Sequence, residues 1–369
     1  MTDLIVSADS HVMEPSDLWT TRLPAELRDR APRVLPDDDG PGWSFHAPGL
    51  NVSPVSGAWG AGRSGEDLKD HLASAGPETA RPSGWDPAER LKDQDIDGVH
   101  TEVLYGTLGM RLFRSTDAEV QQAAFRVYND WLADYCAHAP SRLVGLGLVS
   151  LWDVDRGVAE LERCAELGHR GAMIWGYPPE DRPYHSPVYD RLWAAASDLG
   201  MPLSLHIVTG MGPESLIEFS APALRYMNLI HETQRSISQL VLGGVLERFP
   251  RLQIVGAESD IGWLPHWIQR MDHGWEKFGA MMDTELALRP SEYMNRQVWF
   301  TFMDDEIGSS TADHLGVRIM WGSDFPHTDS TWPDSQSVIA RNLAGASASL
   351  AEQVLRENAV ELYGLDLSG

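Results

Sequence analysis

Residues 3–15 read DLIVSADSHVMEP, and this stretch decides between two common α/β folds. A short apolar run at 3–8 is followed at once by Asp9 and His11, and no glycine precedes Pro15. A doubly wound nucleotide-binding sheet would require a glycine-rich phosphate loop after its first strand. Polar side chains at the carboxyl end of a first strand are instead typical of a (β/α)8 barrel, whose catalytic residues lie at that face.

The rest of the chain repeats a short β-type run followed by a helical segment. We count eight β-type runs, at residues 3–8, 99–104, 143–149, 170–174, 201–206, 252–257, 297–302 and 317–321. Apolar residues recur at helical spacing in segments such as 118–138, 153–167 and 187–199. Strands that alternate with amphipathic helices favour parallel βα units, and eight units favour a closed TIM barrel. We therefore predict a single barrel domain over residues 1–369.

Residues 16–85 interrupt this alternation. They are rich in Pro, Gly and Asp, with clusters such as LPDDDGPGW and GAWGAGRSG, and a helix is expected to begin near residues 85–87. A long excursion of this kind is usually functional. We predict an insertion after the first strand that serves either as a lid or as an oligomer arm.

The composition is that of a globular protein with a large core, at 43% hydrophobic and 22% charged residues. The net charge of −25 disfavours nucleic acid and anionic membranes as partners. Cys136 and Cys164 lack metal-type spacing and are expected to be buried thiols in a reducing compartment. With no signal peptide and no long apolar segment, the sequence predicts a soluble cytoplasmic protein.

Five chemistry-bearing side chains stand at the ends of predicted strands: Asp9, His11, His206, Glu258 and Asp324. The carboxyl ends of barrel strands meet at one face, so these side chains are expected to lie together. A mixture of imidazoles and carboxylates suits Zn, Mn or Fe. We predict a metal enzyme.

The roles of the individual residues are less sharply defined by the sequence. Asp324 and Glu258 are the expected catalytic residues, with Asp324 as the acid/base on the last strand and His327 beside it as a supporting group. His231 and His266 are either further metal ligands or packed histidines, and Glu14 is either a ligand or part of a loop.

Candidates for substrate binding come from arginines and tryptophans. Arginine suits bidentate carboxylate recognition, and large aromatic side chains suit a hydrophobic substrate. The candidate arginines are Arg111, Arg114 and Arg235. The candidate tryptophans near the expected barrel mouth are Trp175, Trp263, Trp267 and Trp321, although core packing explains many of them equally well.

Three motifs taken together resemble the amidohydrolase-related family, whose members include aminocarboxymuconate-semialdehyde and resorcylate decarboxylases. The motifs are ADSHVMEP at 8–15, GVLERFPRLQIVGAE at 244–258 and WGSDFPH at 321–327. The resemblance implies a distorted (β/α)8 barrel and metal-ligand roles for His11, His206 and Asp324. It also implies a dimer or larger assembly.

Two departures from the family pattern guide the functional expectation. The family often has His-x-His on the first strand, where this chain has Asp9-x-His11, and Glu258 stands where a histidine usually ends the sixth strand. The resulting carboxylate-rich site resembles a branch of the family that contains dinuclear non-haem iron oxygenases. HETQRSI at 231–237 and AESDIGWLPHWIQRMDH at 257–273 add to that resemblance.

The leading prediction is therefore a diiron or iron–manganese monooxygenase acting on a hydrophobic organic acid or its thioester. It would need O2 and an external reductant. One metal would be held by Asp9, His11 and Asp324, and the other by His206 and Glu258 with His231 or His266. The alternative is a Zn- or Mn-dependent hydrolase or non-oxidative decarboxylase of an organic carboxylate.

Overall fold

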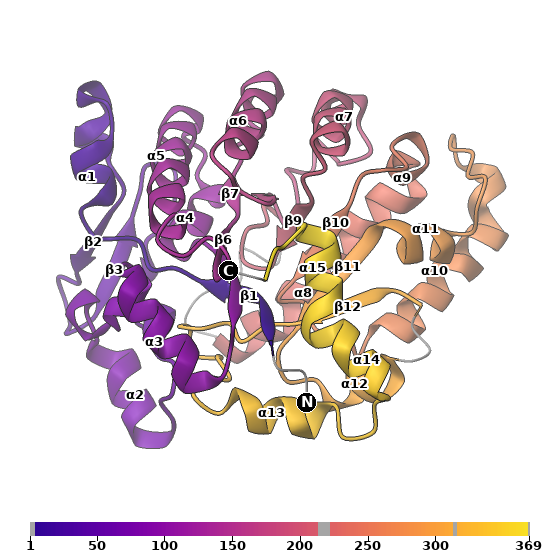
Figure 1. Cartoon of the computed structure of the whole chain (residues 1–369). Coiled ribbons are helices and arrows are strands. Elements are labelled where there is room, and N and C mark those ends of the chain that lie inside the picture. The colour runs from indigo at the N-terminus through magenta and orange to yellow at the C-terminus, as the bar shows by residue number, and fades with distance from the viewer. Residues whose placement is uncertain (1–3, 213–221, 313–315, 368–369) are drawn as a thin grey trace.

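The computed structural model describes residues 4–212, 222–312 and 316–367 (Figure 1). Its core is a barrel of parallel strands with helices around the outside. The barrel strands are β1 Val6–His11, β5 Thr101–Tyr105, β6 Leu143–Gly145, β7 Gly147–Leu148, β8 Ala172–Ile174, β9 Leu203–His206, β10 Ile254–Ala257, β11 Val298–Phe302 and β12 Arg318–Trp321. Each of the eight predicted runs thus contains a strand, and the predicted (β/α)8 barrel is confirmed.

The barrel closes through two irregular seams. β6 and β7 form one run interrupted at Leu146, so this run pairs with β5 on one side and with β8 on the other. At the second seam, the His11 amide donates to the Phe325 carbonyl at 2.7 Å and the Asp324 amide donates to the Asp9 carbonyl at 2.9 Å. The second seam brings the first and last strands of the barrel together.

The first strand ends later than the sequence indicated. We expected residues 3–8, but β1 continues to His11, which is paired with Tyr105 of β5. Polar side chains do not end this strand because its backbone continues to pair with β5 and every residue in it is buried. Asp9 and His11 therefore belong to the rigid barrel wall and not to a loop.

The outer helices lie between the barrel strands in the sequence and after the last strand. They are α3 Pro87–Asp97, α4 Leu108–Arg111, α5 Ala118–Cys136, α6 Val154–Glu166, α7 Asp190–Leu199, α8 Pro222–Leu242, α9 Val245–Arg248, α10 Leu264–Phe278, α11 Pro290–Gln297, α12 Glu306–Thr311, α13 Ser335–Asn342, α14 Ala348–Glu352 and α15 Asn358–Tyr363. Local sequence sets their ends: Asp117 caps the first turn of α5 by accepting from the Val120 amide. Gly98, at φ 71°, ends α3 in the left-handed conformation that glycine adopts without strain.

The insertion at 16–85 has regular structure of its own. It contains α1 Leu18–Arg22, α2 Gly65–Ser74 and a small antiparallel sheet of β2 Arg33–Pro36, β3 Trp43–His46 and β4 Ser53–Pro54. It bonds to the segment that follows the last barrel strand, because the Thr328 amide donates to the Gly57 carbonyl and the Ala61 amide to the Pro326 carbonyl. Its role as a lid or an oligomer arm stays a prediction.

Two further sequence expectations concern the thiols and membrane segments. Cys164 is buried and Cys136 half-buried, both are free thiols, and burial raises the pKa of each. No helix within the described ranges is long and apolar enough to cross a membrane.

Candidate metal centre

Four side chains from three barrel strands converge at one end of the barrel. Asp9 and His11 come from β1, His206 from the end of β9, and Asp324 from the turn after β12. All four are almost fully buried. Within the described chain, Asp9, His11 and His206 form one group whose ligand atoms could share an ion, and His11, Asp324 and His327 form another.

Backbone carbonyls fix the orientation of both histidine rings. His11 Nδ1 lies 3.0 Å from the Gly106 carbonyl, and His206 Nδ1 lies 2.9 Å from the Ile207 carbonyl. A carbonyl can only accept, so each Nδ1 carries a hydrogen, and Nε2 offers a lone pair whenever the ring is neutral. Both Nε2 atoms lie 3.6 Å from Asp9 Oδ1. This arrangement is the one used to prepare histidine for metal ligation.

The two carboxylates are held in a similar way, each with one oxygen bonded to the protein. Asp9 Oδ2 accepts from Thr301 Oγ1 at 2.7 Å and from the Glu258 amide at 3.0 Å. Asp324 Oδ1 accepts from His327 Nδ1 at 2.8 Å. Each carboxylate is thereby oriented so that its other oxygen is directed away from the bonded protein groups.

The atoms left without a hydrogen bond test whether a cation fits. They are Asp9 Oδ1, His11 Nε2, His206 Nε2 and Asp324 Oδ2, all buried. Each buried unsatisfied group costs about 1–3 kcal/mol. Two imidazole nitrogens and two carboxylate oxygens in one buried region suit a divalent transition metal. The residues present therefore fit a metal ion.

The electrostatics of the cluster also favour a bound cation. Burial and the charges of Asp324 and Asp9 raise the pKa of Glu258 well above its usual value. Burial opposes protonation of His11, yet contacts with Asp324 and Asp9 raise its pKa to about 9. Like-charged carboxylates concentrated in a buried site are relieved by a cation.

Left-handed backbone turns accompany these strand ends. Glu258 and Asp324 have φ values of 49° and 54°, which ordinary residues adopt rarely and at a cost of about 1–3 kcal/mol. Such outliers concentrate at functional sites. The Glu258 turn lets its amide bond Asp9 while its carboxylate lies 3.5 Å from His206 Nε2.

The structure also places two residues that sequence reasoning did not select. Thr301 on β11 donates to Asp9 and accepts from the Glu258 amide at 2.8 Å. Thr107 follows β5 and lies 3.1 Å from His327 Nε2, and the His327 ring lies 4.0 Å from the His11 ring. A threonine within an apolar strand gives little signal in a single sequence, because its hydroxyl usually serves packing or a local backbone bond.

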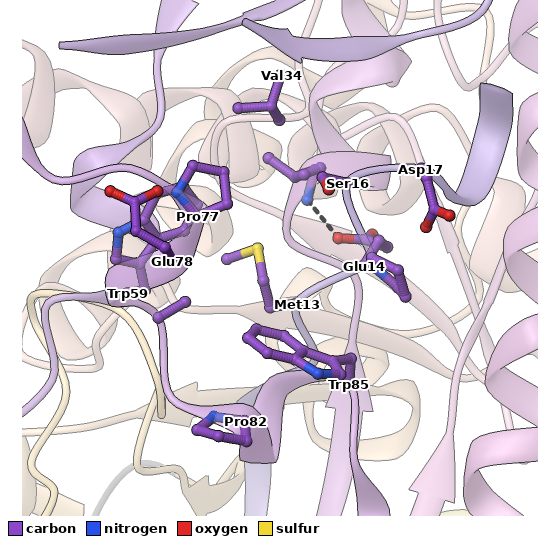
Figure 2. A pocket seen from close by; sticks show the side chains of 13 residues that line it. Met13, Glu14, Ser16, Asp17, Val34, Trp59, Pro77, Glu78, Pro82 and Trp85 are labelled. Carbon is purple, nitrogen blue, oxygen red and sulfur yellow. Dashed lines mark hydrogen bonds between the residues drawn. The ribbon is translucent and has the colours of Figure 1, made fainter. Parts of the chain in front are cut away.

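Several predicted site residues lie elsewhere. His231 on α8 and His266 on α10 have exposed side chains and belong to neither ligand group within the described chain. Glu14 is buried, but both of its oxygens accept backbone amides, from Leu108 and Gly109, at 2.8 Å each. Glu14 also lines a pocket of about 430 Å³. Figure 2 shows this pocket from close by, with a dashed line that ends on the Glu14 carboxylate.

The predicted substrate-binding aromatics are also accounted for. Trp175 is fully buried and its Nε1 donates to the Phe113 carbonyl at 2.8 Å, so it serves as core packing. Trp321 is likewise buried. Trp263 is half-buried, packs on Trp267, and donates to the Ser259 carbonyl.

Buried imidazoles and carboxylates at the strand ends of a (β/α)8 barrel define the class of protein as a metal-dependent barrel enzyme. A profile of the amidohydrolase family matches residues 35–365. The chain belongs to this amidohydrolase family.

Curated relatives within the family are decarboxylases. The chain is 25% identical over 286 residues to 2-amino-3-carboxymuconate-6-semialdehyde decarboxylase of Dictyostelium discoideum, covering 76% of this chain and 77% of the relative. It is 27% identical over 339 residues to γ-resorcylate decarboxylase of Rhodococcus jostii, covering 81% of this chain and 98% of the relative.

Solved structures share the fold. An amidohydrolase of Mycobacterium avium subsp. paratuberculosis matches with a TM-score of 0.80 at 20% identity, covering 99% of this chain and 100% of that one. The 5-carboxyvanillate decarboxylase of Novosphingobium aromaticivorans, solved with bound manganese, matches with a TM-score of 0.70 at 20% identity, covering 98% of this chain and 97% of that one.

These relatives overturn the leading functional prediction. We expected a diiron or iron–manganese monooxygenase with O2 and an external reductant, and this prediction is wrong because the similar proteins of known activity are decarboxylases. Manganese, and not iron, is the metal found in the related structures. The physical reason for the error is that a carboxylate-rich ligand set suits Mn as well as Fe, so residue types alone do not separate the two chemistries.

Proposed function

We propose that this protein is a metal-dependent, non-oxidative decarboxylase of an organic acid, with an aromatic carboxylate as the substrate class. The observation that carries the proposal is the set of four buried ligand atoms, Asp9 Oδ1, His11 Nε2, His206 Nε2 and Asp324 Oδ2, that lack hydrogen-bond partners. The decarboxylase relatives, and the aromatic acids bound in two related structures, support it.

The chain's own residues would divide the work as follows. Asp9, His11, His206 and Asp324 would hold one divalent cation, with Mn the first choice and Zn the alternative. When bound, that ion supplies a Lewis acid that attracts the substrate carboxylate. His327 would hold Asp324 in place through its Nδ1 contact, and Thr301 would hold Asp9.

We assign the proton donor to Glu258. Its carboxyl lines a hollow of about 100 Å³ with Ile207, Tyr226 and Met303, where a ligand can reach it. Asp324 is less accessible, being buried and bonded to His327. During the reaction the bond between the carboxylate carbon and the substrate carbon that bears it breaks, and CO2 leaves. A proton from the Glu258 carboxyl then forms a new C–H bond at that substrate carbon. Solvent then returns the proton to Glu258.

The test is metal-dependent CO2 release. Protein stripped with a chelator and reloaded with Mn or Zn is incubated with 2,6-dihydroxybenzoate and 5-carboxyvanillate, and both CO2 and the decarboxylated product are measured. We expect release only after reloading, at equal rates in air and under nitrogen. Stoichiometric metal binding without CO2 release from either acid would contradict the proposed reaction for these substrates and redirect the search to other acids carrying the same groups.

A paired variant checks the assignment of Glu258. Glu258→Gln keeps the shape of the side chain but cannot exchange a proton, so kcat is expected to fall while metal content is retained. Asp260→Asn is the matched control, because Asp260 is a carboxylate two residues away in the same turn. Equal losses in the two variants would argue against proton donation by Glu258.

A further inference from the structure

One fully buried arginine contacts both chain segments that meet at the second seam of the barrel. Arg90 lies on α3, and its side chain is 0% exposed. An arginine on an amphipathic helix usually faces solvent, and a fully buried one requires a partner for its charge and its N–H groups. The partners of Arg90 therefore show what this side chain does in the fold.

The charge of Arg90 is balanced by Glu102 on β5. Arg90 Nε donates to Glu102 Oε2 at 2.5 Å, and Nη2 donates to Oε1 at 2.9 Å. This is the two-point geometry in which a guanidinium group and a carboxylate match best. Glu102 is itself buried, and its Oε2 also accepts from Gln94 Nε2 at 2.8 Å. The ion pair therefore fixes the orientation of the guanidinium group against β5.

The remaining contacts of Arg90 reach the seam between the first and last barrel strands. Nη1 donates to the His11 carbonyl at 2.7 Å, and Nη2 lies 3.5 Å from the Phe325 carbonyl. The guanidinium carbon also lies 4.7 Å from the centre of the Phe325 ring. Phe325 directly follows Asp324, and its carbonyl accepts from the His11 amide as well. One guanidinium group thus contacts the two main-chain segments that carry His11 and Asp324.

These two segments approach each other so closely that a change in their spacing must move the ligands. A β-carbon at Gly322 would lie 2.5 Å from Asp9 Cβ and 2.9 Å from the Asp9 carbonyl oxygen, so a larger residue would force the segments apart. Across the same seam, His11 Nε2 lies 3.2 Å from Asp324 Oδ1. A metal site requires its ligand atoms within about 0.5 Å of their working positions. The group that fixes the backbone spacing therefore affects how well the ligands fit an ion.

We propose that Arg90 is a positioning residue for the metal centre, which sets the separation of His11 and Asp324 by holding the main chain beside both. Arg90 acts through these two ligands and not on the ion itself. The inference rests on the ligand set of the proposed function, but not on the reaction that the metal serves. Residues that orient metal ligands are worth about 10–100-fold in metal affinity.

Arg90→Lys tests this role while keeping a positive charge beside Glu102. A lysine ammonium lacks the planar fork that bonds Glu102 at two points and reaches the His11 carbonyl at the same time. Mn affinity, measured by competition with a fluorescent chelator, is expected to fall by at least about 10-fold. The visible absorption spectrum of the Co-loaded protein reports ligand geometry directly and is expected to change. An unchanged Mn affinity, or an unchanged Co spectrum, overturns the proposal.

A matched control measures what a loss of stability alone does to metal binding. Asn129 is also fully buried and also bonds a barrel strand, because it donates to the Leu148 carbonyl at 3.1 Å and accepts from the Leu148 amide at 2.7 Å. Leu148 lies in β7, which carries none of the four proposed ligands. Asn129→Ala should lower the free energy of unfolding in urea and leave Mn affinity and the Co spectrum unchanged. Equal losses of Mn affinity in Asn129→Ala and Arg90→Lys overturn the proposal.

Glu102→Gln decides the question where Arg90→Lys does not fold. Glutamine has the shape of glutamate but offers one acceptor oxygen in place of two, so it releases one end of the guanidinium group. The loss of one bond is expected to lower Mn affinity by about 2–10-fold. An unchanged Mn affinity in Glu102→Gln overturns the proposal.

The metal titrations also separate the role of Arg90 from the proposed reaction. CO2 release by the wild-type protein, together with unchanged Mn affinity in Arg90→Lys, would keep the decarboxylase and overturn the role of Arg90. Mn affinity and a Co spectrum that depend on Arg90, in a protein that releases no CO2 from any acid tested, would keep the positioning role and remove the decarboxylase.

Discussion

The two sides of the catalytic face carry opposite charges. On the side of β1, β10 and β12, carboxylates crowd around two imidazoles, and burial with neighbouring acids raises the pKa of Asp260 to about 7. In the loops after β5 and β9, burial lowers the pKa of Arg111, Arg114 and Arg225, and the charge of Glu232 opposes this shift for Arg114 and Arg225. His206 ends β9 and Arg225 lies on α8, which follows β9, so the two groups of charges are separated by loop and not by strand.

The largest effect is expected on Mn affinity when a proposed metal ligand is removed. Asp324→Asn keeps the size of the side chain but loses a negative charge in a buried cluster. Mn affinity should therefore fall by more than the roughly 10–100-fold that is typical when a residue hydrogen-bonded to a metal ligand is mutated. Competition titration with a fluorescent chelator measures the affinity. Asp329→Asn, which removes a neighbouring acid that is no ligand in our assignment, should bind Mn within a few-fold of wild type. Unchanged Mn affinity in Asp324→Asn would remove Asp324 from the ligand set.

The next largest effect is expected on kcat, when the proposed proton donor is replaced. General acid catalysis is worth about 10²–10⁴-fold, so Glu258→Gln should lower kcat by at least about 100-fold at full metal occupancy. Stopped-flow measurement of a single turnover separates this loss from slow product release. A kcat within a few-fold of wild type would show that the proton comes from another group.

The hydroxyl that holds Asp9 gives an intermediate effect. Thr301→Val removes the 2.7 Å hydrogen bond to Asp9 Oδ2 at nearly constant side-chain volume. Loss of a residue that hydrogen-bonds to a metal ligand typically lowers metal affinity by about 10–100-fold. Thr301→Ser keeps the hydroxyl and should retain most of the affinity, measured by the same competition titration. If Thr301→Val and Thr301→Ser bind Mn equally well, the hydroxyl does not orient Asp9.

The smallest effect is expected on the arginine side. Ser53→Ala removes one of the two bonds that fix Arg111, and a single hydrogen bond is worth about 0.5–1.5 kcal/mol net, or about 2–10-fold. The free energy of unfolding, measured by urea denaturation, should fall by about that amount, with Mn affinity unchanged. A loss of Mn affinity in Ser53→Ala would show that the two sides are coupled through the insertion.

The sequence predicted the barrel well because a buried parallel strand leaves a clear apolar run that ends where its side chains turn polar. Asp9, His11, His206 and Asp324 were chosen as candidate ligands for the same reason, since each stands at or just after such an end. The end of β1 was misplaced because a polar side chain can still lie in a buried strand when other groups satisfy it.

Residues on helices were harder to place than residues on strands. Arg235 was chosen as a substrate-binding candidate and Arg225 was not, although both lie on α8. Arg225 is seven residues before Glu232 and shares its buried face, whereas Arg235 is three residues after Glu232 and is exposed. The sequence pattern around them does not show which face of this helix rests on the strand ends. His231, predicted as either a metal ligand or a packed histidine, is exposed on α8.

The second seam of the barrel has a consequence for how the protein is made. Asp9 and His11 lie in the first barrel strand to be synthesised and Asp324 directly follows the last, yet the Asp324 amide bonds the Asp9 carbonyl. Until β12 is synthesised, the edge of β1 lacks this partner, and only part of the proposed ligand set exists. Binding of one ion by all four proposed ligands would therefore have to wait for β12, and chains truncated before β12 should not retain the ion.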